Sequence, residues 1–443
     1  MSLLSLSAAR LGLGLLGAAA IVTSCAATPQ QVPNTPPIAE PAPTPPTVPS
    51  IPPFSPSGNA EMDAWRDDYA SRALASGRDP IILYETLADI RPLSIYLSDD
   101  VEIASTDVSD QAEFAKPVWE YVRTAVTSSR KSRGAQKLAE LAPIFDQIET
   151  QYGVDREALT AIWAMETNLG SYIGEFDAAN TLSNMAVEGR RRSFAERELD
   201  ALMKLQERGE VDRDQLISGW AGAMGQTQFM PSTFLAYAVD GDGDGRKDLW
   251  GSEADALASA ANYLKVSGYQ NNMPWGIEVL APTDFDWSMA DGQDRRISTW
   301  ASNGLSPIAT SAFTVSDGTF AELWLPSGAT GPKYLLFKNF DVFKTYNRSD
   351  SYALSVGLLT DGVGGQSGPI TPWPTTLELL SKGDIRVLQA NLNRLGFDAG
   401  PVDGIAGRGT KGALRRFQAA NGIRPADGFP TRQALQQVLA ATG

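Results

Sequence analysis

The 443-residue sequence predicts a mainly helical α+β protein, with a small β element inserted in its main body and a small helical module at its C-terminus. Apolar residues recur at helical spacing in several segments between residues 59 and 266. Short runs such as GIEVL, AELWL and KYLLF, separated by Gly, Asp and Ser, follow between residues 274 and 343 and indicate strands. A linker rich in Gly, Pro and Thr then precedes further helical periodicity. A chain of this length is expected to form two or three domains.

The composition limits the chemistry that the protein can perform. There are no histidines, which excludes Ser-His-Asp hydrolases, Cys-His proteases and His-ligated zinc enzymes. The net charge of -15 argues against nucleic acid as a partner. Any catalysis must therefore use carboxylates, hydroxyls, lysines or a hard metal ion.

The N-terminus has the features of a secretory signal. Arg10 supplies a positive charge, and the apolar run from Leu11 to Val22 is too short to span a bilayer but suits the core of a signal peptide. We therefore expect residues 1–24 to be removed. The run from Thr28 to Pro56 is dominated by Pro and carries almost no charge, which predicts an extended, semi-rigid spacer within a linker of residues 25–58.

The signal segment ends in VTSC, with Cys25 as the only cysteine of the chain, so no disulfide can form within one chain. VTSC resembles a bacterial lipobox. The resemblance implies cleavage before Cys25, lipidation of that residue and anchoring to a membrane by more than one acyl chain. Neither Ala26 nor Ala27 is Asp, which by family analogy favours the periplasmic face of the outer membrane. The alternative is a soluble periplasmic protein with an ordinary signal peptide.

Helices are expected along the whole first part of the main body. Each shows apolar residues on one face and polar residues on the other. A kink or break is expected at Pro143. The predicted helical segments are one from Asn59 onward, Phe114 to Ser128, Ala135 to Tyr152, Val154 to Gly170, Ser193 to Gly209, and Ala254 to Val266.

The segment from Val154 to Gly170, VDREALTAIWAMETNLG, places a carboxylate on an apolar face. Leu159, Ile162 and Trp163 lie seven, four and three residues before Glu166, so all four side chains share one side of the helix. Asp155 is a candidate N-cap and Gly170 a candidate C-terminal stop.

A carboxylate beside Trp and Ile is poorly solvated, which raises its pKa and suits it to donate a proton to a leaving oxygen. The alternative is that Glu166 caps a neighbouring helix or pairs with an Arg. Glu175 and Asp177 are the nearest candidates for a second carboxylate, but their spacing does not place them opposite Glu166. Solvated loop charges are the preferred interpretation for both.

The segment from Ser218 to Thr233, SGWAGAMGQTQFMPST, mixes small residues with Met, Gln and Phe. Its small residues, Ala221 to Ala223 and Gly225, allow the backbone to approach another group closely. That group is either a ligand or a tightly packed helix.

Together these stretches resemble the membrane-bound B type of the lytic murein transglycosylases. The matching pieces occur in the order and at about the intervals of that family, and they cover roughly Asn59 to Leu359. They are AIWAMETNLG, EGRRRSF, AGAMGQTQFMPS, DGDGDGRKDLW, ALASAANYL and YNRSDSYALSV. The resemblance implies a lysozyme-like helical catalytic domain, with the β element as one wall of its cleft. It also implies cleavage of the MurNAc-GlcNAc bond of peptidoglycan without water, which leaves a 1,6-anhydro sugar.

The resemblance also assigns roles to individual residues. Glu166 matches the single general acid and base, whereas ordinary glycosidases need a carboxylate pair. Arg190 and Arg191 match an arginine pair that could meet lactyl or stem-peptide carboxylates. Gly219 stands where some relatives have Ser, so this chain has no side-chain hydroxyl at that position. The residues that match the saccharide cleft are Tyr121, Gln228, Tyr263, Tyr346, Asn347 and Tyr352.

The run DGDGDGRKD from Asp240 to Asp248 resembles the start of a calcium-binding EF-hand loop. Gly245 stands at the sharp turn, but position twelve is Gly251 rather than Glu. Asp255 or Glu253 could close the site. The candidate ligands are Asp240, Asp242, Asp244, Asp248 and Asp255; a plain Asp/Gly turn is the alternative. No cofactor is required, and a calcium ion would be structural.

The C-terminal segment from Leu379 onward contains two evident helices, one with Ile385, Leu388, Leu392 and Leu395 and one with Ala413, Leu414 and Phe417. VDGIAGRGT and FQAANG resemble the three-helix peptidoglycan-binding domain type 1. Residues 59–359, 360–378 and 379–443 are therefore expected to form the catalytic domain, a linker and this module. Two alternatives remain for the whole protein, a non-catalytic peptidoglycan-binding lipoprotein tether and a lysozyme-type muramidase.

Overall fold

The computed structural model describes residues 50–97 and 116–442. Cys25, the signal segment and most of the Pro-rich linker lie outside these residues. No helix among the described residues combines the length and the apolar character needed to cross a bilayer.

The main body begins with a series of helices connected by short turns. Its elements are α1 (Ala60–Ala75), α2 (Pro80–Leu87), α3 (Ser94–Leu97), α5 (Val118–Ala125), α6 (Ser128–Glu140), α7 (Ala142–Tyr152), α8 (Arg156–Thr167), β1 (Phe176–Asp177), α9 (Ala178–Glu188), α10 (Arg192–Glu207), β2 (Ile217–Ser218), α11 (Pro231–Tyr237) and α12 (Glu253–Val266).

A five-stranded antiparallel sheet follows, in the order β4-β6-β7-β3-β5. Leu336 of β7 stands opposite both Gly276 of β3 and Glu322 of β6, which sets the register of the central strands. The elements of this part are β3 (Gly276–Leu280), β4 (Arg295–Arg296), α13 (Ile297–Ser302), β5 (Ser306–Pro307), β6 (Phe320–Trp324), β7 (Tyr334–Leu336), α14 (Lys338–Phe343) and α15 (Asp350–Val363). The predicted strands GIEVL, AELWL and KYLLF correspond to β3, β6 and β7.

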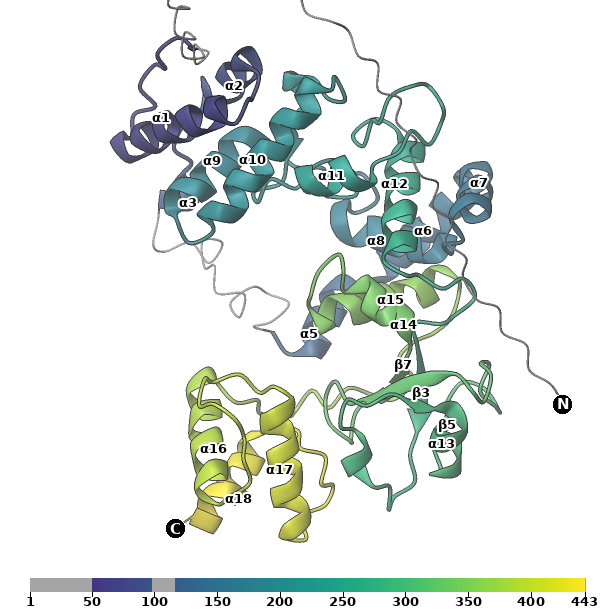
Figure 1. Cartoon of the computed structure of the whole chain (residues 1–443). Coiled ribbons are helices and arrows are strands. Elements are labelled where there is room, and N and C mark those ends of the chain that lie inside the picture. Colours follow the sequence, from purple (N-terminus) through teal and green to yellow (C-terminus); the bar gives the residue numbers. More distant parts are fainter. Residues whose placement is uncertain (1–49, 98–115, 443) are drawn as a thin grey trace, which may run out of the picture. The chain divides into compact units, whose positions relative to one another are not determined.

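Two hydrophobic cores hold the helical body together. One forms around α8 and α15, which pack side by side, and the other around α9 and α10 (Figure 1). Helix α12 contributes to both, with Leu257 in the first core and Ala256 in the second. Tyr346 also packs against both cores. The boundary between the two cores is therefore a place where residues from distant segments meet.

The C-terminal module consists of α16 (Lys382–Arg394), α17 (Arg408–Ala420) and α18 (Arg432–Thr442) around its own small core. Leu388, Leu392 and Phe417 are buried in it, as the helical periodicity predicts. Gln389 is also buried, and its side-chain amide donates to Asp403 and Ile405 of the loop that follows α16 and to Thr410 in the first turn of α17. These contacts fasten the VDGIAGRGT segment to α16. The predicted fold class, mainly helical with a small β insertion and a C-terminal three-helix module, is confirmed.

Some predicted boundaries are wrong by a few residues, for local reasons. The break expected at Pro143 is confirmed, because α6 ends at Glu140 and Pro143 lies in the first turn of a new helix, α7. The predicted start at Ala135 is wrong, because α6 already begins at Ser128. The helix predicted to reach Ser128 ends at Ala125, because the Thr127 side chain accepts a hydrogen bond from the Arg130 amide and starts α6.

The end of the predicted linker packs against α1 and α2. The Phe54 ring stacks on Tyr84 at 5.3 Å between centroids, and the guanidinium of Arg66 lies 4.6 Å from the centre of the Phe54 ring. Arg66 also donates to the Ser55 carbonyl at 2.8 Å. The packed structure therefore begins several residues before Asn59, which the sequence suggests as its start.

Candidate active site

Helix α8 carries Glu166 and is held at its start by charged groups. Asp155 is the N-cap residue, but its carboxylate accepts a hydrogen bond from the Tyr269 hydroxyl at 2.8 Å instead of capping the helix. Burial raises the pKa of Asp155. Arg156 pairs with Asp146 and Glu149 of α7, which ties the two helices together.

The helix ends at Thr167, three residues before the predicted stop at Gly170. Asn168, Leu169 and Gly170 are all left-handed, with φ of 53°, 64° and 73°. A side chain at Gly170 would have its Cβ 2.5 Å from Oε1 of Gln226. Gly170 is therefore required by a close approach from another segment rather than as the helix terminator.

Gln226, which the sequence analysis did not single out, fixes this helix end. Its Oε1 accepts from the Trp163 indole at 3.1 Å, and its carbonyl accepts from the Thr167 hydroxyl at 2.6 Å. Its own amide donates to the Trp250 carbonyl at 3.1 Å. The only sequence signal for Gln226 is the pair of glutamines in MGQTQ, of which the family resemblance points to the second, Gln228.

Glu166 meets a tyrosine hydroxyl from another helix. Leu159, Ile162 and Trp163 are fully buried, as expected, whereas Glu166 is only partly buried. The hydroxyl of Tyr352, on the first turn of α15, donates to Oε1 of Glu166. Tyr352 is buried, and burial together with the Glu166 carboxylate raises its pKa far above the ordinary value. It therefore remains a protonated donor at any physiological pH.

A cluster of aromatic rings lies beside this pair. The rings of Tyr263 and Tyr346 are 5.2 Å apart, and Phe229 and Tyr237 pack against Tyr263. Tyr263 donates to the Thr345 carbonyl at 2.9 Å. The buried hydroxyl of Tyr346 has no hydrogen-bond partner among the described residues. Burial and then the nearby Glu166 charge raise the pKa of Tyr346, so this hydroxyl is a neutral donor near the carboxylate.

Tyr121 and Asn347 lie at the edge of the same region. Tyr121 is half-buried on α5, and its proximity contributes to the raised pKa of Tyr352. Asn347 follows Tyr346, and its side-chain oxygen accepts from the Ser349 amide at 3.0 Å. Because Ser349 caps α15, Asn347 helps to position the start of the helix that carries Tyr352.

Gln228 lies in the loop before α11, with a left-handed φ of 50°. Its amide donates to the carbonyls of Ile173 and Gly225 at 3.3 and 3.1 Å, while its Oε1 has no described hydrogen-bond partner. A Cβ at Gly219 would lie 2.9 Å from that oxygen. The glycine thus leaves room for the Gln228 amide where a serine would crowd it.

The other predicted polar residues have separate contacts. Arg190 is exposed and pairs with Glu188, and the guanidinium of Arg191 lies 4.5 Å from the centre of the Phe194 ring. Asp177 caps α9 and pairs with Arg213, so its carboxylate is engaged elsewhere. Glu175 is exposed, as expected for a loop charge.

The acidic loop brings together three of the five predicted calcium ligands. Carboxylate oxygens of Asp240, Asp242 and Asp244 lie within 4.8 Å of one another. Asp255 is buried, and its carboxylate accepts from the amides of Gly241 and Asp248 at 2.7 and 2.6 Å. Asp248 itself accepts from the amides of Trp250 and Gly251. Three carboxylates fit a hard cation, while Asp248 and Asp255 brace the loop.

Two family models match the chain. The model of the transglycosylase SLT domain covers residues 61–361, and that of a peptidoglycan binding domain covers residues 381–438. The chain belongs to the transglycosylase SLT domain family. The predicted family, its enzyme class and the peptidoglycan-binding module are therefore confirmed.

Particular relatives agree with this assignment. The chain is 31% identical over 219 residues to membrane-bound lytic murein transglycosylase B of Escherichia coli (strain K12), a match that covers 48% of this chain and 58% of that relative. It is similar to SltB3 from Pseudomonas aeruginosa in complex with NAG-anhNAM-pentapeptide, at 39% identity and a TM-score of 0.79, over 86% of this chain and all of that one. It also resembles the Escherichia coli lytic transglycosylase Slt35 in complex with calcium, at 25% identity and a TM-score of 0.56, over 69% of this chain and 93% of that one.

Proposed function

We propose that this protein cleaves the β-1,4 bond between MurNAc and GlcNAc in peptidoglycan without water, leaving 1,6-anhydroMurNAc ends, with Glu166 as the single general acid and base. The contact between the Tyr352 hydroxyl and the Glu166 carboxylate carries this proposal. It holds one carboxylate at the boundary of the two helical cores, and the candidates for a second one, Glu175 and Asp177, are exposed or engaged elsewhere.

In the first step, protonated Glu166 donates its proton to the glycosidic oxygen as the bond from that oxygen to C1 of MurNAc breaks. The GlcNAc leaves with a free hydroxyl at C4. Positive charge develops at C1 of the muramoyl sugar, and the carboxylate that remains stabilises it. Tyr352 keeps the carboxylate in place while its charge changes.

In the second step, the C6 hydroxyl of the same MurNAc attacks C1 and transfers its proton to the Glu166 carboxylate. A new bond joins O6 to C1, and Glu166 returns to its protonated form. The reaction is balanced without water, so one carboxylate is sufficient, in contrast to a hydrolase with a positioned water and a second carboxylate.

The remaining site residues would bind the glycan. Tyr121 and Tyr346 lie near the pair of Tyr352 and Glu166, and Tyr263 packs against Tyr346, so the three rings would contact the sugars. Gln228, with its free oxygen, could accept from a sugar hydroxyl, and Asn347 could contact the saccharide near Tyr346. Arg190 and Arg191 would meet the carboxylates of lactyl groups or stem peptides.

The flanking segments would keep the enzyme at its substrate. The module of residues 379–443 would bind the wall, and lipid on Cys25 would anchor the chain to the periplasmic face of the outer membrane. In this arrangement the enzyme acts in cell-wall remodelling. Cys25 lies outside the described residues, and mass measurement of the membrane-extracted protein tests the lipidation.

Calcium would have a structural role at Asp240, Asp242 and Asp244. We expect calcium to raise the melting temperature, and at 100 times Kd it adds about 2.7 kcal/mol to the free energy of unfolding. Asp242→Asn should remove this response in thermal unfolding with calcium or EDTA. Asp214→Asn, which neutralises an exposed carboxylate outside the loop, should keep it. An equal response in both variants would show that calcium acts elsewhere.

The reaction is tested by mass spectrometry of muropeptides released from purified peptidoglycan by residues 26–443. We expect products one water lighter than lysozyme fragments, and a loss of about 10²–10⁴-fold in rate for Glu166→Gln. Hydrolytic reducing-end products would overturn the proposal in favour of a muramidase. Sedimentation with the wall but no cleavage would favour a non-catalytic tether.

A further inference from the structure

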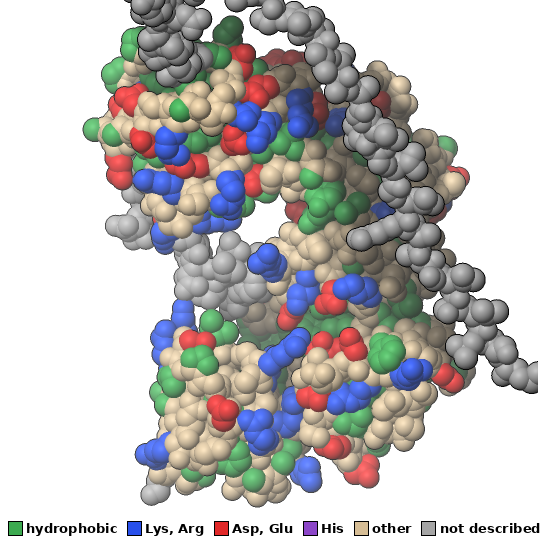
Figure 2. Space-filling view, in the orientation of Figure 1, with side chains coloured by type: hydrophobic (Ala, Val, Ile, Leu, Met, Phe, Trp, Pro, Cys, Tyr) green, Lys and Arg blue, Asp and Glu red, His purple; other side chains and the backbone are tan. Residues whose placement is uncertain are grey.

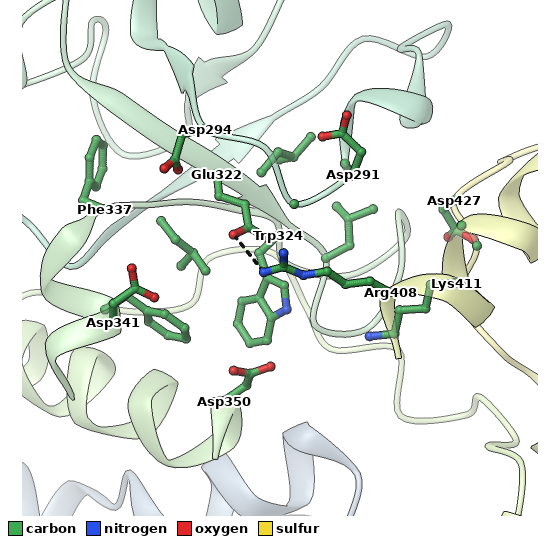
Figure 3. Close-up of a pocket in the computed structure, with 18 of the residues that line it drawn as sticks. Asp291, Asp294, Glu322, Trp324, Phe337, Asp341, Asp350, Arg408, Lys411 and Asp427 are labelled. Carbon is green, nitrogen blue, oxygen red and sulfur yellow. Dashed lines mark ion pairs between the residues drawn. The ribbon is translucent and has the colours of Figure 1, made fainter. Parts of the chain in front are cut away.

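A cavity of about 900 Å³ lies between the β insertion and the C-terminal module. Figure 3 shows Arg408 and Lys411 of α17 extending toward Glu322, Trp324 and Asp350 across this space. Neither part encloses the cavity alone. Its volume lies in the range that binds small organic ligands or short peptides.

The cavity walls are held together by specific contacts. Asp427 of the module accepts a hydrogen bond at 2.8 Å from the amide of Ala329 in the insertion. A Cβ at Gly328 would lie 2.9 Å from the Asp427 carboxylate. On the other side, a Cβ at Gly292 would come within 3.0 Å of the Arg408 guanidinium carbon. Both glycines allow the insertion to approach the module closely.

Most acidic groups that line the cavity already have cationic or amide partners. Asp291 pairs with Arg295 at 2.8 Å, Asp350 with Lys344, and Asp341 with Lys338 at a longer 3.8 Å. The Arg408 guanidinium lies 3.9 Å from Glu322, which is a loose pair, and the Arg408 side chain remains 78% exposed. Arg408 is therefore available to a ligand.

Lys411 differs from the other lysines of the cavity. It has no hydrogen-bond or ion-pair partner among the described residues, although the residue is partly buried. Burial lowers the pKa of its ammonium group, and the nearest opposing charge, Asp350, is paired with Lys344. A partly buried ammonium without a partner loses part of its hydration, so an anionic ligand here would offset that loss.

An apolar wall and one carboxylate without a described partner complete the cavity. The Trp324 ring packs on Phe340 at 5.5 Å between centroids, and its indole N–H has no described partner. Asp294 also lines the space without a described partner, near half-buried Glu322 (Figure 3). Basic side chains gather on the visible face where α17 meets the insertion (Figure 2). The cavity thus offers cationic, apolar and anionic surfaces together.

We propose that this cavity is a second binding site, separate from Glu166, for the peptide stem of peptidoglycan. A carboxylate of the stem would bind Lys411 and Arg408, its aliphatic part would pack on Trp324, and its amine would face Asp294 and Glu322. The identity of the ligand rests on the proposed function, because only a peptidoglycan enzyme meets this peptide at high local concentration. The site would hold a neighbouring stem while another part of the wall occupies the cleft.

The test is isothermal titration of residues 26–443 with a sugar-free stem pentapeptide. We expect binding to the unaltered chain, at least tenfold weaker binding to Lys411→Met and to Arg408→Gln, and unchanged binding to Glu166→Gln. Lys382→Met, at an exposed lysine of α16 outside the cavity, is the matched control and should bind normally. A pentapeptide with amidated carboxylates should bind as weakly to the unaltered chain as the acid binds to Lys411→Met.

Absence of pentapeptide binding to the unaltered chain, or binding to Lys411→Met and Arg408→Gln as tight as to the unaltered chain, would overturn the proposal. Weaker binding in Glu166→Gln alone would place the peptide in the catalytic cleft instead. The reaction is measured independently by the muropeptide products. Anhydro products without peptide binding would support the proposed function and overturn the second binding site. Peptide binding without products would support the second binding site and overturn the proposed function.

Discussion

At the scale of single residues, the proposed mechanism depends on the hydrogen bond from the Tyr352 hydroxyl to Glu166. A tyrosine hydroxyl ordinarily ionises near pH 10, but Tyr352 is buried against a carboxylate and keeps its proton. The residue therefore positions Glu166 in both of its protonation states, and its hydroxyl would not compete as a base.

We expect Tyr352→Phe to lower kcat about 10- to 100-fold, because a hydrogen bond to a charged group contributes about 1.5–3 kcal/mol. Tyr269→Phe is the matched control, since its hydroxyl also donates to a carboxylate of α8, that of Asp155. It should lower stability with little change in kcat. Muropeptide release assays and thermal unfolding of both variants measure the two effects. An unchanged kcat in Tyr352→Phe would show that this contact does not serve the reaction.

At the scale of elements, the short β1-β2 pair connects the end of α8 to the glutamine loop. Phe176 pairs with Ser218, and bridges from Ser218 to Met224 and from Met224 to Phe229 continue the connection. Gln226 and Gln228 lie in the turn between Met224 and Phe229, which the second of these bridges closes. The backbone around Gly174 is so close that a Cβ there would lie 2.1 Å from the Ser218 carbonyl oxygen.

Gly174→Ala should therefore lower stability by more than about 2 kcal/mol, because it combines a left-handed backbone with a clash against main chain. Gly77→Ala is the control, since Gly77 is left-handed too but has open space around its Cβ position. It should cost about 1 kcal/mol. Thermal unfolding of both variants separates the cost of the left-handed backbone, which both share, from the cost of the clash, which only Gly174→Ala has. Similar melting temperatures for the two variants would mean that the backbone around Gly174 and Ser218 shifts to accommodate the added methyl group at little cost in stability.

At the scale of the whole molecule, Asp361 makes stability depend on pH. Burial raises its pKa from 3.8 to about 6, against the opposing effect of the Trp275 indole that donates to it at 3.1 Å. The native state therefore holds this proton more tightly than the unfolded chain. The contribution of protonated Asp361 to the free energy of unfolding is fully present below about pH 4 and is lost as pH rises through about 6. The total loss at high pH is about 3 kcal/mol.

Asp361→Asn should raise the melting temperature at pH 7–8 and leave it nearly unchanged near pH 4, because the amide needs no proton and can still accept from Trp275. Asp214→Asn removes the same charge from an exposed site and corrects for the acidic net charge of the protein. Thermal unfolding across pH 4–8 measures the difference. A gain of equal size at every pH would contradict the raised pKa.

The helices and the module were predictable because their signals are local. Apolar spacing in the Glu166 helix and in the helix with Leu388 and Leu392 depends only on residues within a few turns. The ends were less predictable. Where α8 stops depends on Gln226, almost 60 residues later in the chain, and no local pattern reports that contact.

The sequence by itself determined the helical class, the β insertion, the C-terminal module and the choice of Glu166 as the candidate acid. Periodicity and the order of motifs can be read from the linear sequence, so these predictions do not require the fold. The lipid anchor and the domain boundaries stay predictions. Only the tertiary structure decided that Tyr352 meets Glu166, that Asp255 braces its loop, and that Lys411 faces a cavity. Those relations join residues far apart in the chain, and their energies depend on burial and distance, which a linear sequence does not contain.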